Sequence, residues 1–148
     1  MGAPDGHDAA ACSRAWQTLR LAHDRVARHL GARLARGCAL AINEFDVLRF
    51  VRSHPDDGVR LGALREAVPL SQPALSRLVA RLEERGLLAR SEAADDGRAT
   101  VIRLTNAGDA LLNRAIGVHA QAVHEALTSE FSDAKQAALL HTLSQISQ

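Results

Sequence analysis

The chain has 148 residues, of which 47% are hydrophobic, and its formal net charge at pH 7 is +1. Aromatic residues make up only 3% and there is no Tyr, so the core is expected to be aliphatic, which favours packed helices over a β-sandwich. No apolar run approaches the ~20 residues that cross a bilayer, and two cysteines are too few for a disulfide framework. We therefore expect one domain of a cytoplasmic protein with reduced thiols and no membrane partner.

The N-terminal part of the sequence predicts two helices. Residues 1–9 are rich in Gly, Asp and Ala and are expected to be disordered, without the basic and apolar order of a signal peptide. Residues 10–36 are predicted to be helical, because apolar side chains recur at steps of three or four positions, with His23 filling one gap: Cys12, Trp16, Leu19, Val26, Leu30 and Leu34. A second helix is predicted from Asn43, a suitable N-cap, to about Ser53.

The middle of the chain predicts a helix-turn-helix. Residues 59–61 fit a very short strand, 62–67 a short helix and 68–70 a turn. A longer helix is predicted over 71–85, because Ser71 is a good N-cap, Pro73 is tolerated in a first turn and Gly86 suits the end of a helix. The apolar stripe of this helix is expected to face inward, and its members are Leu75, Leu78, Val79 and Leu82.

The remaining sequence predicts a β-hairpin and two further helices. Residues 87–91 and 100–104 are typical of strands, and the polar loop between them, centred on Asp95-Asp96-Gly97, joins them as a hairpin. Helices are expected over about 107–127 and from about 131 to the C-terminus. The chain is thus predicted to be mostly α-helical with a small β-wing, which is a winged helix-turn-helix.

The helix predicted over 71–85 has the side chains that a DNA-recognition helix needs. A short preceding helix braces such a helix so that its N-terminal half enters the major groove. The exposed residues at that end are Ser71, Gln72, Ser76 and Arg77. Hydroxyl, amide and guanidinium groups suit base edges and phosphates, so these four residues are predicted to contact double-stranded DNA.

Three stretches of the sequence resemble the MarR family of transcription regulators. They are FDVLRF at 45–50, VPLSQPALSRLVARLEERGLLAR at 68–90 and DDGRATVIRLTNAG at 95–108. The specific features are a D-x-R wing, here Asp96-Gly97-Arg98, and an L-T-x-x-G start to the next helix, here Leu104 to Gly108. The resemblance covers about residues 10–146.

This resemblance implies a homodimeric regulator that usually represses and is released by a small molecule. It implies one MarR-like domain over 10–148, with a DNA-binding lobe at 41–106 and dimerisation helices in 10–40 and 107–148. It also implies that Arg98, in a wing over about 91–100, enters the minor groove. A two-fold dimer is expected to bind a pseudo-palindromic operator.

An effector site is predicted on the first helix, where a polar and aromatic set accompanies the apolar stripe. Arg14, Trp16, Arg20 and His23 suit a small aromatic acid or a phenol, because a guanidinium pairs strongly with a carboxylate. The resemblance places such ligands between the dimerisation helices and the DNA-binding lobe. Asp46 and Arg49 on the second helix are further candidates to line this cleft, the alternative being that they form surface ion pairs. The alternative is that His23 is bonded to a carbonyl group and that Trp16 only packs in the dimer.

Other functions have weaker support in the sequence. Cys12 lies near the start of a helix, where a thiolate is favoured, so a thiol-based redox sensor is one alternative. A winged helix that only binds proteins is another, although it would not need Arg98 beside a polar helix face. No two histidines show i, i+4 spacing, and no catalytic or phosphate-binding motif is present, so neither a metal, a cofactor nor an enzyme activity is expected.

Overall fold

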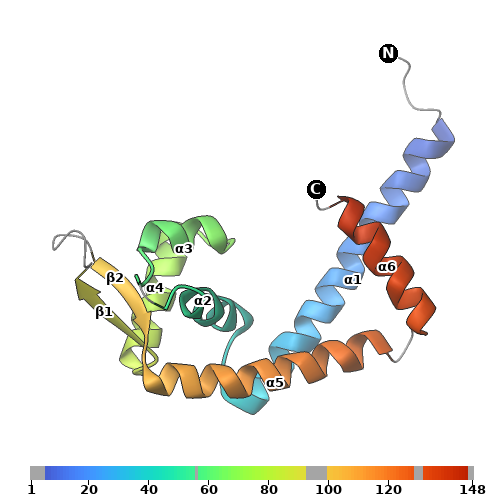
Figure 1. The fold of residues 1–148 in the computed structure, drawn as a ribbon. Helices are drawn as coiled ribbons and strands as arrows, with labels where there is room; N and C mark the ends of the chain where they lie inside the picture. The colour runs from blue at the N-terminus through green and yellow to red at the C-terminus, as the bar shows by residue number, and fades with distance from the viewer. Residues whose placement is uncertain (1–5, 56, 93–99, 129–131, 147–148) are drawn as a thin grey trace.

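The computed structural model describes residues 6–55, 57–92, 100–128 and 132–146. Its elements, in chain order, are α1 (Gly6–Cys38), α2 (Ile42–Arg52), α3 (Leu61–Ala67), α4 (Gln72–Glu84), β1 (Leu88–Glu92), β2 (Thr100–Leu104), α5 (Asn106–Thr128) and α6 (Asp133–Ile146). Figure 1 shows α2, α3, α4 and the hairpin together at one end, with α1 and α6 at the other and α5 running between them. The predicted mostly helical fold with a small β-wing is confirmed.

The α2–β2 part, which we call the winged-helix lobe, is built around an aliphatic core. All four residues of the predicted inner stripe of α4 are buried, each with at most 3% of its surface exposed: Leu75, Leu78, Val79 and Leu82. Phe45 of α2, Leu64 of α3 and Leu88 of β1 are buried in the same cluster. Because one face of α4 is occupied in this way, its opposite face is left at the surface.

The hairpin is short and antiparallel. Leu88 pairs with Leu104 at its base and Glu92 pairs with Thr100 near the loop. The very short strand predicted at 59–61 is a single β-bridge, in which Val59 pairs with Ile102. The hairpin therefore carries a third segment at its edge, which ties the loop after α2 to the wing.

The start of α5 shows why Gly is needed at position 108. The Thr105 hydroxyl donates a hydrogen bond to the Gly86 carbonyl oxygen over 2.7 Å, and the Gly108 N–H donates to the Thr105 hydroxyl oxygen over 3.0 Å. A Cβ atom at Gly108 would lie 2.1 Å from the Leu87 carbonyl oxygen. The L-T-x-x-G sequence thus packs α5 directly onto the turn between α4 and β1.

Several boundaries differ from the prediction by one or two residues, and two differences at helix starts are informative. Residues 6–9 belong to α1, so the expected disorder over 1–9 is wrong for these residues. The second helix begins at Ile42 with Ala41 as N-cap, and not at Asn43. The physical reason is that the Glu44 carboxylate accepts a hydrogen bond from the Ala41 N–H over 2.9 Å, which gives a donor at the helix start its partner.

The terminal helices α1 and α6 differ along their length in how far the rest of the chain buries them. Leu30, Leu34 and Cys38 in the second half of α1 are buried, and this half packs against α5. In the first half, Cys12, Trp16 and Leu19 lie on the surface, although the periodicity suggested a covered stripe. None of the described residues of α6 is buried. Among the described residues, no helix is long and apolar enough to span a membrane.

Candidate DNA-binding surface

The N-terminal end of α4 presents the four predicted DNA-contacting residues. Ser71 is the N-cap, with an extended backbone (φ −64°, ψ 152°), and its hydroxyl makes no capping hydrogen bond. Ser71, Gln72 and Arg77 are exposed and Ser76 is half-buried. The free backbone N–H groups and the dipole at a helix N-terminus favour a phosphate. One end of α4 thus combines a backbone suited to a phosphate with exposed polar side chains of the kinds that contact bases.

Arg65 of α3 belongs to the same surface, and the sequence did not indicate this. Its Nη1 atom donates a hydrogen bond to Oε1 of Gln72 over 3.3 Å. The turn at 68–70 separates the two residues, so no helical spacing could have paired them. The bond leaves the Gln72 amide nitrogen as the group directed to other partners, and it adds a guanidinium to the surface.

The base of the wing is held against α4 by an ion pair. The Arg90 Nε atom of β1 lies 2.9 Å from Oε1 and 3.0 Å from Oε2 of Glu83. On β2, the Arg103 side chain donates to the Ser91 hydroxyl oxygen over 3.2 Å. These contacts fix the orientation of the hairpin relative to α4 within the lobe. The predicted minor-groove residue Arg98 lies outside the described residues.

The predicted effector residues lie on a part of α1 that a single chain leaves exposed, with Trp16, Arg20 and His23 on one side of the helix and Arg14 on the opposite side. Arg14, Trp16, Arg20 and His23 are all exposed, and the Trp16 side chain has 64% of its surface accessible. Nδ1 of His23 lies 3.3 Å from Oδ1 of Asp24. No group of three or more His, Cys, Asp or Glu side chains in the described part of the chain could hold a metal ion.

A cavity of about 410 Å³ lies instead between α2 and the turn that follows α3. Asp46, Arg49, Phe50 and Ser53 line one side, and Val68 and Pro69 line the other. Burial raises the pKa of Asp46 above its ordinary value of 3.8, while the charges of Arg49 and His119 oppose this shift. The cavity therefore combines a cationic group and a carboxyl whose pKa is raised by burial, beside an apolar wall.

Comparisons with known proteins agree with this fold. Residues 40–99 match the model of the MarR family. The chain is similar to wild-type MarR from E. coli, with a TM-score of 0.78 and 20% identity over 99% of this chain and 98% of that one.

Two further solved structures concern DNA binding and its regulation by a small molecule. Sco3205 from Streptomyces coelicolor, a MarR family transcriptional regulator in complex with DNA, has a TM-score of 0.77 and 24% identity over 91% of this chain and 88% of that one. BpsR from Bordetella bronchiseptica, whose DNA binding is regulated by 6-hydroxynicotinic acid, has a TM-score of 0.75 and 23% identity over 89% and 91%.

These findings confirm the resemblance to a family of transcription regulators, which is not a family of enzymes. The family model matches residues 40–99, whereas the likeness to the solved structures concerns the fold. Residues 40–99 thus match the MarR family of transcriptional regulators, and the solved structures share the fold of nearly the whole chain.

Proposed function

We propose that this protein is a homodimeric repressor that binds a pseudo-palindromic operator through the N-terminal end of α4 and the wing. The observation that carries the proposal is the arrangement of α4. Its apolar stripe is buried in the lobe, and the opposite face presents Gln72 and Arg77 with Arg65 beside them. In this assignment Arg98 supplies the minor-groove contact, where a narrow groove has enhanced negative potential.

The dimer is proposed to form through the terminal helices. Trp16 and Leu21 of α1 and Leu140 and Ile146 of α6 are each more than half exposed in the single chain. Exposed apolar surface of this kind marks a protein interface, and a two-fold interface buries the same patch on both subunits. A dimer with two equivalent recognition helices would read half-sites about 10 bp apart or a multiple of that distance.

The DNA contact is tested by removing single arginines. Arg77→Ala and Arg98→Ala are each expected to weaken binding to the DNA upstream of the gene by ~1–3 kcal/mol, measured by gel shift in one salt concentration. Arg114→Ala is the matched control. Arg114 is exposed on α5, so its substitution removes the same charge at a position outside α4 and the wing. Equal losses in all three variants would mean that only net charge matters, and absence of DNA binding in the parent would favour a protein-binding winged helix.

The effector is proposed to be a small aromatic acid or phenol. Two groups of residues compete for it. Arg14, Trp16, Arg20 and His23 would need a second chain to cover them, whereas the cavity beside Asp46 and Arg49 exists in one chain. In the cavity, an aromatic carboxylate would pair with Arg49 and a phenol hydroxyl could donate to Asp46.

Variants of the protein distinguish between the two candidate effector sites. Aromatic acids and phenols are screened by thermal shift and gel shift on the parent, on a Trp16→Ala/His23→Ala variant and on Arg49→Ala. A compound that releases the parent from DNA should fail on the variant that has lost its site, because release requires differential affinity for the two conformations. A compound that releases all three proteins equally would exclude both sites.

A further inference from the structure

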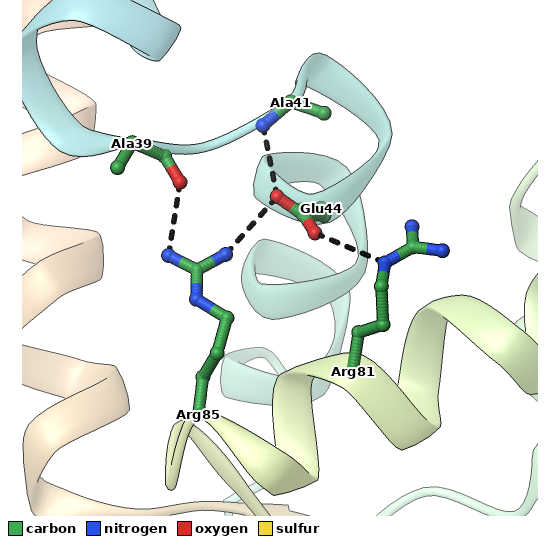
Figure 2. Close-up of polar contacts among 5 residues, drawn as sticks. All are labelled: Ala39, Ala41, Glu44, Arg81 and Arg85. Atoms are coloured by element: carbon green, nitrogen blue, oxygen red, sulfur yellow. Dashed lines mark hydrogen bonds and ion pairs between the residues drawn. The ribbon is translucent and has the colours of Figure 1, made fainter.

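Glu44 is the one charged residue that is buried among the described residues, and it joins the start of α2 to the end of α4. Figure 2 shows its carboxylate between the start of α2 and the end of α4. Oε2 accepts hydrogen bonds from the Ala41 N–H over 2.9 Å and from Nη1 of Arg85 over 3.2 Å. Oε1 lies 3.8 Å from Nε of Arg81. A buried carboxylate requires such partners, and here both guanidinium groups come from α4.

Arg85 also contacts the backbone that ends α1. Its Nη2 atom donates to the Ala39 carbonyl oxygen over 2.9 Å. Ala39 has φ 51°, the left-handed conformation that residues other than Gly adopt at an energetic cost. The turn after α1 is therefore held by a side chain from the C-cap of α4, as Figure 2 shows. One guanidinium bridges the turn and the Glu44 carboxylate.

We propose that Glu44 and Arg85 act as positioning residues for DNA recognition, and we call the pair the Glu44–Arg85 clamp. The clamp sets the direction of α4 relative to the end of α1. If α1 forms the dimer, as in the proposed function on which this inference rests, that direction sets the distance between the two recognition helices. A helix of 13 residues is roughly 20 Å long, so a small rotation at its C-terminal end displaces its DNA-facing N-terminus by several times more.

Two substitutions loosen the clamp by different routes. Glu44→Gln keeps the size and an oxygen that can accept from Ala41 N–H, but it removes the charge between the two arginines. Arg85→Met removes both bonds of the guanidinium and leaves Glu44 as the cap of α2. Glu83→Gln is the matched control, because the Glu83–Arg90 pair also joins α4 to a neighbour, but that neighbour is β1 in the same lobe.

The decisive measurement is discrimination between half-site spacings. Affinities are compared for the operator fragment that the parent protects and for the same fragment with one base pair inserted or deleted at its centre. The ratio of the two affinities is expected to fall about fivefold or more in Glu44→Gln and Arg85→Met, the size of a typical coupling between sites, and to stay unchanged in Glu83→Gln. A general loss of stability would lower binding to both fragments and leave the ratio unchanged. The clamp is overturned if folded variants keep the ratio of the parent, or if Glu83→Gln lowers it equally.

A second measurement needs no DNA and separates this inference from the proposed function. Nitroxide labels are attached to Arg36→Cys on α1 and Arg77→Cys on α4, in a Cys12→Ser background. Electron spin resonance then measures the distance between the two labels, and dilution with unlabelled protein ensures that both labels belong to the same chain. The distribution should broaden with Glu44→Gln or Arg85→Met and stay as in the parent with Glu83→Gln. An unchanged distribution in the first two variants overturns the clamp. If the parent binds the fragments with altered half-site spacing as tightly as the original fragment, the proposed function as a dimeric repressor is contradicted, whatever the label distances are.

Discussion

The winged-helix lobe and the terminal helices differ in how completely one chain covers their apolar side chains. In the lobe, Phe45, Leu64 and Leu82 each have at most 1% of their surface exposed. In the first half of α1 and in α6, Trp16 and Leu140 have 64% and 72% exposed. The core of the lobe is therefore complete within one chain, whereas the terminal helices leave large apolar side chains exposed, as at a protein interface. A second copy of the chain is the partner that we propose.

The contrast between the covered lobe and the exposed terminal helices can be tested by mutation. The largest effect is expected on the free energy of unfolding when a buried side chain of the lobe is removed. Phe45→Ala removes a fully buried ring that stacks on His119, with the ring centroids 4.8 Å apart. The free energy of unfolding is expected to fall by ~3–5 kcal/mol, because the lost transfer energy and the residual cavity add. Urea unfolding followed by circular dichroism measures it.

Phe50→Ala is the comparison for that experiment. Phe50 is also on α2, but it is only half-buried and lines the open cavity. Its loss should cost clearly less, because water already reaches the site. Similar losses for both variants would mean that the core of the lobe is not centred on Phe45.

A smaller effect, in the assembly and not in the fold, is expected from α6. Leu140→Asp should weaken the dimer by about 2 kcal/mol or more, because the substitution occurs twice in a two-fold interface and removes apolar contacts. Sedimentation at several concentrations measures the dissociation constant. The unfolding of the lobe should be unchanged, since Leu140 is exposed in the single chain.

Gln145→Glu is the control for charge on the same helix. Gln145 is exposed, and its side chain bonds His141 within α6. A dimer that tolerates Leu140→Asp as well as it tolerates Gln145→Glu would move the interface away from this face of α6.

The smallest effect concerns pH and the cavity wall. Burial raises the pKa of Asp46 above 3.8, so between 3.8 and the raised value the folded chain binds more protons than the unfolded chain. The free energy of unfolding should therefore fall slightly as the pH rises through this interval. Asp46→Asn should remove that part of the pH dependence, measured by urea unfolding from about pH 4 to 7. Parallel pH profiles for the parent and the variant would contradict it.

Local chemistry in the sequence was enough to place α4 and its polar N-terminal end. Ser71 is the N-cap, Pro73 lies in the first turn and Gly86 follows the helix with φ 69°. Each of these features depends on one residue and its nearest backbone, so a linear sequence contains it in full. The apolar stripe of α4 was predicted for the same reason, because helical periodicity depends only on spacing. The contacts of Arg98 with DNA stay a prediction.

Only the tertiary structure decided which distant polar side chains pair and which apolar helix faces are buried. Glu44 and Arg85 are 41 positions apart, and Arg65 meets Gln72 across a turn, so no spacing rule could pair them. The covered half of α1 was equally undetermined, because periodicity shows that a helix has an apolar side but not what packs on it. Which part of α1 is buried depends on where α5 packs against it, and in the fold Leu34 is buried while Trp16 stays exposed. Caps and stripes act over a few residues, whereas pairing and burial depend on the route of the whole chain through space.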